Sequence, residues 1–324
     1  MKIVTISVVR NEADIIEALV RFHAPWVDRM LMIDHASADA TPAILERLRQ
    51  EGLPVAITRS DAAGFVQGAM TTEAMQRAAR DADWIVPLDA DEFLHAPGGD
   101  VRSVLQRCSE DAVVRFPWRT YVPRAADDAA EANVLKRIRH RRCLEEPQYF
   151  KIAIPGKIAR SKRAVVEQGA HQLKRWARGD RGRFPVRTEE GLRLAHFPVR
   201  SGPQMMTKAL VGWLSMLAKP DRGPTETYHW KGLYDRFVES QTVDARELSE
   251  LALRYASTDE AVWKRQTLVE DAVPLSDGGF ELRYTAGEPG ALVPILARQA
   301  EGFATALAEL RRNGGGKLFR RRKS

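Results

Sequence analysis

Four short apolar runs alternate with amphipathic stretches in the first 88 residues, and this alternation restricts the possible folds more than any other feature. The apolar runs cover residues 3–9, 30–33, 55–58 and 84–88. Between them, the helical spacing of apolar residues predicts helices over residues 15–22, 41–51 and 70–80. Strands that alternate with helices at this spacing form a mainly parallel sheet with helices on both faces. We therefore predict an α/β fold.

Single residues indicate where several of these elements begin and end. Asn11 or Asp14 is able to cap the first helix, because both side chains accept hydrogen bonds from free backbone N–H groups. Pro42 suits the first turn of the second helix, where its missing N–H does no harm. Pro87 cannot donate to a central ladder, so it marks a bulge or the end of the fourth strand.

From Val113 onward the pattern changes to shorter elements separated by polar loops. Strands are predicted over residues 113–118, 149–154, 157–159, 192–197 and 278–286. Helices are predicted over residues 204–219, 233–241, 247–255 and 294–312. The second half of the chain is therefore expected to end in a mostly helical region.

The charges of this basic chain are distributed in blocks. Residues 1–133 carry 14 basic and 21 acidic side chains, whereas residues 134–200 carry 18 basic and 6 acidic ones. Residues 311–324 carry seven basic side chains and no acidic one. Two separate basic blocks suggest two anionic partners, and the terminal one suits anionic lipid headgroups or a disordered, solubilising end. No nucleic-acid-binding motif accompanies the charge, so we expect no nucleic-acid partner.

The two cysteines, Cys108 and Cys143, do not form a CxxC pair. Isolated thiols favour a reducing compartment and give no zinc site, so we expect a cytoplasmic protein. No apolar run approaches the roughly 18–20 residues that cross a bilayer. The basic end would then allow peripheral contact with the inner face of an anionic membrane.

The fourth apolar run ends in Asp89, Asp91 and Glu92, within the segment DADWIVPLDADEF. Ligands of such sheets collect beyond the carboxyl ends of the strands, where polar residues follow every strand. The rim residues are Arg10, Asn11, Glu12, Asp34, Arg59, Asp89 and Asp91. Two carboxylates two residues apart in an extended segment can point the same way and suit a hard divalent cation that also takes diphosphate oxygens. No glycine-rich phosphate loop follows the first strand.

Three segments at strand ends, in this order, resemble the GT-A glycosyltransferases of family 2, and more narrowly a bacterial branch near the family 92 type. They are VVRNEADIIEALVRFH, MLMIDHASADATPAILERL and DADWIVPLDADEFL. Weaker matches cover residues 157–171 and 194–209, so the resemblance spans roughly residues 1–209. It implies a GT-A fold, which is a Rossmann-like nucleotide-diphospho-sugar transferase sheet, with a helical C-terminal extension.

The resemblance also implies a domain organisation. Residues 1–200 would be the catalytic domain, with a nucleotide-sugar half over about 1–110 and an acceptor half over about 111–200. Residues 201–313 would form the mostly helical region, and residues 314–324 a basic flexible tail.

By resemblance, the donor would be a nucleotide-diphosphate sugar and the acceptor a carbohydrate or glycolipid hydroxyl, with inversion at the anomeric carbon. The predicted donor-binding residues are Arg10, Asn11, Glu12, Asp34, Ser37, Asp39, Arg59, Asp89, Lys157 and Arg200, with Lys208 as a further phosphate or acceptor ligand. The predicted ligands of Mn²⁺ or Mg²⁺ are Asp89, Asp91 and His196.

One departure from the family pattern concerns the general base. The Glu-Asp dipeptide that often marks this base is not recognisable, and Glu145-Glu146 does not replace it. His171 and Asp91 are the candidate catalytic residues for this role. Two alternatives stay open: a nucleotidyltransferase on a similar sheet, although its glycine-rich basic loop is missing, and a non-catalytic scaffold or binding protein that keeps the fold.

Overall fold

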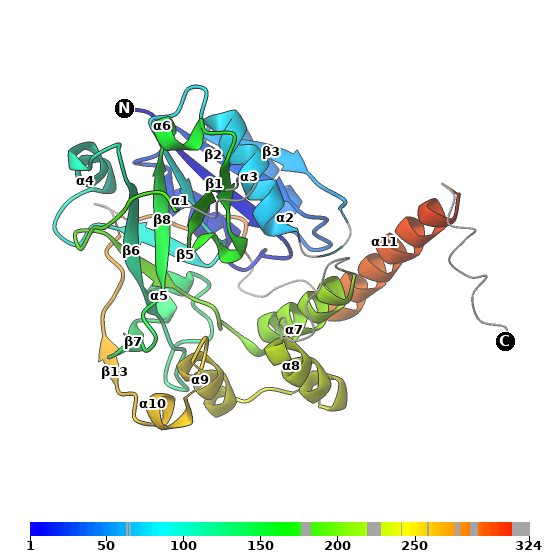
Figure 1. Cartoon of the computed structure of the whole chain (residues 1–324). Helices are drawn as coiled ribbons and strands as arrows, with labels where there is room; N and C mark the ends of the chain where they lie inside the picture. The colour runs from blue at the N-terminus through cyan, green and yellow to red at the C-terminus, as the bar shows by residue number, and fades with distance from the viewer. Residues whose placement is uncertain are drawn as a thin grey trace.

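A mixed β-sheet forms the centre of the molecule in the computed structural model. The residues described are 1–62, 64, 66–175, 183–218, 228–240, 242–257, 259–275, 279–285 and 291–312. The strands of the sheet are β1 (Ile3–Val9), β2 (Arg29–Asp34), β3 (Val55–Arg59), β4 (Trp84–Pro87), β5 (Glu92–His95), β6 (Val113–Thr120), β8 (Phe150–Pro155), β11 (Val186–Thr188) and β12 (Arg193–His196). Their order is β3-β2-β1-β4-β8-β6-β12-β5, and β11 pairs with β6. Figure 1 shows the sheet with helices around it.

The first four strands are parallel, as the sequence predicts, whereas β8 lies antiparallel between β4 and β6. The register aligns the ends of the parallel strands, because Asp34 pairs with Val9 on one side and with Arg59 on the other. Pro87 is the last residue of β4, so it marks a strand end. The polar residues that follow these strands therefore lie on one rim.

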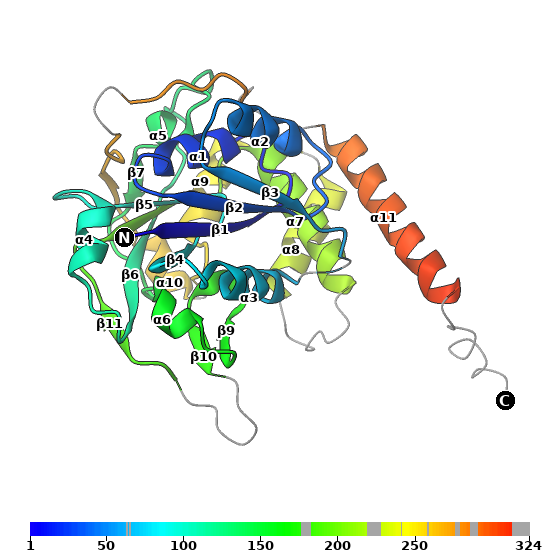
Figure 2. The ribbon, with the colours of Figure 1, turned by 90° about the horizontal axis from the view of Figure 1, so that it is seen from above.

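Helices cover both faces of the parallel strands, which confirms the predicted layers. The helices α1 (Ile16–His23) and α2 (Thr41–Gln50) lie on one face, and α3 (Gln67–Ala78) lies on the other (Figure 2). Each face buries a separate apolar cluster against the sheet. Smaller elements complete this part: α4 (Val101–Arg107), α5 (Val134–Arg137), β7 (His140–Arg142), β9 (Ala164–Val166), the 3₁₀ turn η1 (Gln168–Ala170) and β10 (Leu173–Arg175).

The helical C-terminal region contains α7 (Gly202–Leu217), α8 (Tyr228–Glu239), α9 (Ala245–Leu253), α10 (Glu260–Lys264) and α11 (Leu292–Arg312), together with β13 (Leu268–Glu270), which pairs with β7. Of these helices, α7, α8 and α11 lie beyond the carboxyl ends of the parallel strands, whereas α9 and α10 lie below the sheet in Figure 1. These helices bury a third apolar cluster against Val122 and Val199 of the sheet domain. No helix in the described part of the chain is long and apolar enough to cross a membrane.

The strand predicted over residues 157–159 is wrong. Gly156–Ala159 form a short helix, α6, closed by a hydrogen bond from Arg160 N to Gly156 O. Gly156 lies so close to the loop before β4 that a Cβ atom there would be 2.0 Å from Ala82 O. Three residues are too few for periodicity to distinguish a strand from a helix.

The strand predicted over residues 278–286 is also wrong for the described part, residues 279–285, which contain no strand. Their backbone N–H groups at 283–285 donate to the carboxylate of Glu17 on α1 instead of to a neighbouring strand. This segment packs Phe280, Leu282 and Tyr284 against the apolar cluster under α1. Residues 279–285 of the C-terminal region are thus bound to α1, the first helix of the chain.

Glu17 provides a test of this attachment. Burial by itself raises the pKa of Glu17, but the hydrogen bonds from Arg283, Tyr284, Arg21 and Thr285 outweigh it and hold the pKa below its ordinary value. Such a group stabilises the fold above the ordinary glutamate pKa, and the stabilisation is lost as the pH falls through the lowered value. We expect Glu17→Gln to lower the free energy of unfolding at pH 7 by about 2 kcal/mol, measured by chemical denaturation.

The same measurement at acidic pH should show a smaller difference between Glu17→Gln and the parent chain. The matched control is Glu73→Gln on α3, because the Glu73 side chain is 72% exposed and pairs with Arg77 at only 3.8 Å. That substitution should change the free energy of unfolding by less than about 0.5 kcal/mol. Equal effects of the two substitutions at pH 7 would show that residues 279–285 are not held through Glu17.

Candidate functional site

The acidic segment, residues 88–92, connects β4 to β5 at the rim of the sheet. The side chain of Asp89 is 31% exposed, whereas Asp91 and Glu92 are buried. Buried carboxylates need positive partners, because an unpaired charge is costly where solvent is scarce. The structure supplies these partners from β8, from the loop after β12 and from α7.

Lys151 on β8 neutralises two of the three carboxylates. Its fully buried ammonium lies 2.8 Å from Asp89 Oδ2 and 2.9 Å from Glu92 Oε2. Burial alone would lower the pKa of Lys151, but the two carboxylates raise it above its ordinary value, so the side chain stays charged. The other oxygen of Asp89 accepts a hydrogen bond from Gln67 at the start of α3. Both oxygens of Asp89 are therefore held by the protein.

Asp91 faces a different set of groups. Lys208 on α7 places Nζ 2.8 Å from Asp91 Oδ2, and Arg200 approaches the same oxygen at 3.7 Å. Burial by itself would raise the pKa of Asp91, but the Lys208 ammonium outweighs it and keeps that pKa well below its usual range. Asp91 Oδ1 faces Nε2 of His196, the last residue of β12, at 3.7 Å.

Arg200 joins this carboxylate to the loop after β1. Its Nε and Nη2 atoms donate to both oxygens of Asp14 at 2.7 and 3.0 Å, and Nη2 also donates to Glu12 at 2.6 Å. The remaining nitrogen, Nη1, donates to Phe197 O at 3.2 Å. The guanidinium group is fully buried and its hydrogen bonds go to the protein. Arg200, predicted to hold phosphate, is therefore placed to hold the acidic loops together.

The residues predicted to contact the nucleoside brace two rim loops against each other. Asn11 has the left-handed φ of 56°, its N–H donates to Ser37 Oγ at 3.0 Å, and its Oδ1 accepts from Ala38 N at 2.7 Å. Asp34 Oδ1 accepts from Ser37 N at 3.0 Å. These contacts explain why Asn11 does not cap α1, whose first turn has no side-chain cap.

Asp39 has a similar bracing role. It accepts hydrogen bonds from the backbone N–H groups of Ala13 at 3.0 Å and Thr41 at 2.9 Å. Thr41 in turn accepts from Glu12 N at 2.8 Å. The loops after β1 and β2 are thus fixed relative to each other before any ligand binds.

Three other predicted basic residues occupy different places. Arg10 lies on the rim, where Nη1 donates to Ser215 Oγ of α7 at 3.1 Å and its Nε has no partner among the described residues. Arg59 is exposed at the end of β3 and pairs with Asp61 at 3.2 Å. Lys157 follows β8, whose last residue pairs with the first residue of β4, so it lies at the opposite end of the strands from the acidic segment; there it pairs with Asp111 at 2.6 Å.

Aromatic rings surround the two predicted histidines. The ring of Trp118 on β6 stacks on His196 with centroids 4.6 Å apart and meets His171 edge-on at 5.4 Å. Tyr255 meets His196 at 5.3 Å, and its ring centre is 5.9 Å from Lys208 Nζ. Sequence reasoning missed Trp118 and Tyr255, since nothing local distinguishes them from ordinary core aromatics.

His171 has a defined tautomer. Its Nδ1 lies 2.9 Å from Phe150 O, and a carbonyl oxygen only accepts, so Nδ1 carries the proton and Nε2 has the free lone pair. Burial lowers the pKa of His171 below its ordinary value, so the ring is neutral near pH 7. A neutral histidine with an unprotonated Nε2 is able to act as a general base.

The surroundings of Asp91 fit a divalent cation in chemistry and charge. Asp91 Oδ1 and His196 Nε2 are too far apart for a hydrogen bond, and burial lowers the pKa of His196 to about 3, so its ring is neutral. A carboxylate oxygen and a neutral imidazole suit two ligands of Mn²⁺ or Mg²⁺ whose other positions are filled by diphosphate oxygens. Asp89, the third predicted ligand, is instead engaged by Gln67 and Lys151.

The charges of the site are close to balanced without a metal. The described ion pairs join five carboxyl groups to three cations, and burial raises the pKa of Glu12 to about 7 and that of Glu92 to about 8. Within the described ranges, no three His, Cys, Asp or Glu side chains are grouped to hold a metal by themselves. A cation at Asp91 would therefore depend on oxygens from the ligand.

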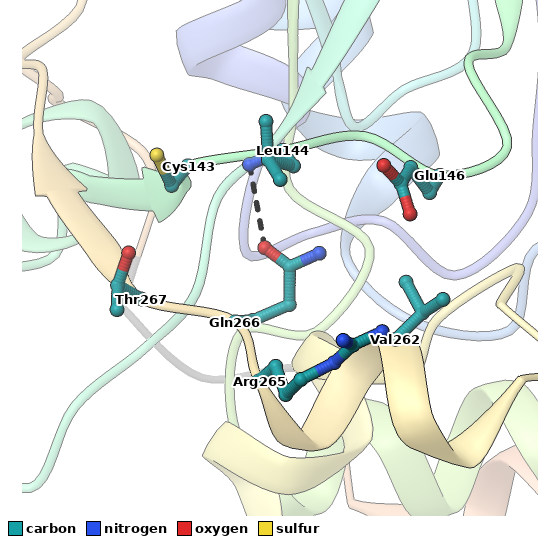
Figure 3. Close-up of a pocket in the computed structure, with 7 residues that line it drawn as sticks. All are labelled: Cys143, Leu144, Glu146, Val262, Arg265, Gln266 and Thr267. Carbon is teal, nitrogen blue, oxygen red and sulfur yellow. Dashed lines mark hydrogen bonds between the residues drawn. The ribbon is translucent and has the colours of Figure 1, made fainter.

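A cavity of about 310 Å³ lies elsewhere, between the segment after β7 and the end of α10 (Figure 3). Cys143, Leu144, Glu146, Val262, Arg265, Gln266 and Thr267 line it. Gln266 Oε1 accepts a hydrogen bond from Leu144 N across this cavity. None of the acidic-segment residues borders it, so we place the candidate site at Asp91.

Comparisons with known proteins give only distant likenesses. No family model matches the chain, and no curated protein matches it. Solved structures with a similar fold include TarS residues 1–349 from S. aureus in complex with UDP-GlcNAc. That likeness has 11% identity and a TM-score of 0.40, and it covers 74% of this chain and 72% of TarS 1–349.

A structure of GalNAc-T7 with UDP, GalNAc and Mn²⁺ is similar at 12% identity and a TM-score of 0.37, over 61% of this chain and 44% of that one. HddC from Yersinia pseudotuberculosis is similar at 11% identity and a TM-score of 0.35, over 60% and 93% of the two chains. Likenesses with TM-scores below 0.5 are too loose to carry a function, so we base the function on this chain's own residues.

The arrangement around Arg200 leads to a stability prediction. Arg200→Met removes the only described cation that contacts Asp14 and Glu12, and an uncompensated buried charge costs about 3–5 kcal/mol. We expect a loss of that size in the free energy of unfolding, measured by chemical denaturation. The control Arg246→Met, on an 88% exposed side chain, should cost less than about 0.5 kcal/mol. A loss below about 1 kcal/mol for Arg200→Met would remove Arg200 as the centre of the site.

Proposed function

We propose that this chain is a glycosyltransferase of the GT-A type that transfers sugar from a nucleoside-diphosphate donor to a hydroxyl acceptor, with inversion, in polysaccharide or glycolipid synthesis. The observation that carries this proposal is the position of Asp91. It follows the carboxyl end of β4, faces a neutral histidine and an ammonium group, and is linked through Arg200 to the loop after β1. That loop is hydrogen-bonded in turn to the loop after β2.

The leaving nucleoside diphosphate gains negative charge as the sugar bond breaks, so positive groups near it lower the barrier. Lys208 is the basic residue best placed to meet this charge, because its side chain is 23% exposed while its ammonium lies beside Asp91. Lys151 is fully buried and keeps Asp89 and Glu92 in place.

The divalent cation implied by the resemblance would be held by Asp91 and His196. Bound there, it would supply further positive charge for the departing diphosphate. Tyr255 and Trp118 would fix the orientation of His196, since its Nδ1 makes no hydrogen bond in the described structure.

His171 is the better of the two candidates for the general base. Asp91 is bound to Lys208 and has a lowered pKa, which makes it a poor proton acceptor. No described residue forms a hydrogen bond with Nε2 of His171, and the ring lies near Lys151 and Asp89, whose charges act on its pKa. An acceptor hydroxyl that reaches Nε2 would lose its proton to it as it attacks the donor sugar.

Thermal unfolding with nucleotides tests the proposed function. We expect a UDP, GDP, CDP or dTDP sugar together with Mn²⁺ to stabilise the chain, by about 2.7 kcal/mol at 100 times the Kd. Asp91→Asn should abolish the part that depends on Mn²⁺, whereas Asp235→Asn on α8, which pairs with Lys231 on the surface, should not.

Other outcomes of this experiment favour the alternatives. Stabilisation by a nucleoside triphosphate and a sugar phosphate, with none by any diphosphate sugar, would indicate a nucleotidyltransferase. No stabilisation by any nucleotide would indicate a non-catalytic scaffold protein and would end the proposal.

A second prediction concerns the competition at Asp91. Lys208→Met removes the cation that neutralises Asp91 Oδ2, so Mn²⁺ alone should bind about tenfold more tightly, while UDP alone should bind about tenfold more weakly. Isothermal titration calorimetry measures both affinities. Lys231→Met, a surface change in an i,i+4 pair, should alter neither. Weaker binding of both ligands would show that Lys208 supports the site's shape and does not compete for Asp91.

A further inference from the structure

Helix α11 is attached to the body by its first half alone. Ile295 is 1% exposed, and Gln299 Nε2 donates to Val211 O and Ser215 Oγ of α7 at 3.3 Å each. Beyond Gln299, the side chains of residues 300–309 make no hydrogen bond or ion pair with another described element, and most are exposed. Figures 1 and 2 both show this half running away from the rest of the molecule.

The apolar stripe of α11 continues along the free half. Leu292 and Leu296 pack into the cluster formed with α7, and Phe303, Ala306 and Leu307 follow at helical spacing. Leu307 is 48% exposed. An apolar stripe that extends past its packing partner indicates a second partner for the remainder.

The charge of the chain beyond this stripe identifies the partner. Residues 311–324 contain seven basic side chains and no acidic one, with Leu318 and Phe319 among them. If a second copy of the chain bound side by side through this stripe, the basic residues 311–324 of the two copies would lie close together. Their positive charges would repel each other, which disfavours a second copy as the partner. An anionic lipid surface complements both features, because it accepts apolar side chains below the headgroups and attracts each basic residue by about 1 kcal/mol.

We infer that residues 300–324 are a membrane-binding arm for an anionic lipid surface. The predicted basic tail, residues 314–324, lies outside the described residues and enters here by its sequence. The arm starts directly after Gln299, which donates a hydrogen bond to Ser215 on α7. Ser215 also accepts a hydrogen bond from Arg10 on the rim, so the start of the arm lies next to the candidate site. If the proposed function holds, the arm would bring the donor rim to a lipid-linked acceptor.

Co-sedimentation of the full chain with vesicles tests the arm without nucleotide or metal, so its result does not depend on the proposed function. We expect binding to phosphatidylcholine vesicles that contain phosphatidylserine, none to phosphatidylcholine alone, and weaker binding as salt rises. Replacing Arg320, Arg321, Arg322 and Lys323 with Gln should weaken binding roughly a thousandfold.

A matched pair of substitutions separates insertion of the stripe from charge attraction. Leu307→Glu and Thr305→Glu add the same charge to exposed positions of α11, but residue 305 lies on the opposite side from Phe303. Leu307→Glu should weaken vesicle binding about tenfold more than Thr305→Glu does.

Two results would contradict the proposal that residues 300–324 bind an anionic membrane. One is equal binding of the full chain to neutral and anionic vesicles, or binding to neither. The other is a dimer in analytical ultracentrifugation that Leu307→Glu abolishes and Thr305→Glu preserves, which would assign the stripe to a second copy.

Discussion

The buried guanidinium of Arg200 holds the site together. It binds Asp14 through two hydrogen bonds and Glu12 through a third, both from the loop after β1, and it approaches Asp91 from the acidic segment. Arg200 itself stands just before α7, whose Ser201 caps the helix by accepting from Gln204 N. One side chain therefore connects the first strand, the fourth strand and the C-terminal helices. Replacement by lysine would not restore this fork, since an ammonium lacks the planar set of donors.

Burying so many charges is expensive, and a fold of this size does not need them for stability. The apolar clusters on both faces of the sheet already hold the layers together. Lys151 shows this cost most clearly, because it is fully buried within an otherwise apolar strand and its ion pairs with described residues go to Asp89 and Glu92 alone. Such an arrangement is reasonable at a site that must present fixed charges to an ionic ligand, because preorganised charges need no reorganisation when the ligand binds.

The position of several site residues follows from the ends of the predicted strands. Neighbouring parallel strands have their carboxyl ends on the same rim of the sheet, so the sequence predicts that Asn11, Asp34 and Asp91 lie on that rim, and the structure has them there. The partners of these residues come from later segments of the chain. Hydrophobic periodicity predicts helices and strands, but it does not predict which later segment packs beside the rim. Lys151 is 62 residues beyond Asp89 in the sequence and reaches it because β8 lies antiparallel beside β4. A lysine inside the apolar run FKIAIP was the available signal.

The helical C-terminal region belongs to the site and is not a mere appendage. It supplies Lys208 to Asp91, and α9 ends beside Tyr255, which packs on His196. Lys208 is also the one described partner of Asp91 that extends from a helix instead of from the sheet or its loops, so its ammonium is the easiest to move. In this structure Lys208 neutralises Asp91. Under the proposed function, a bound diphosphate would offer the same ammonium an anion of higher charge. The attraction between the acidic segment and α7 would then oppose binding of the metal alone and give way to the nucleotide.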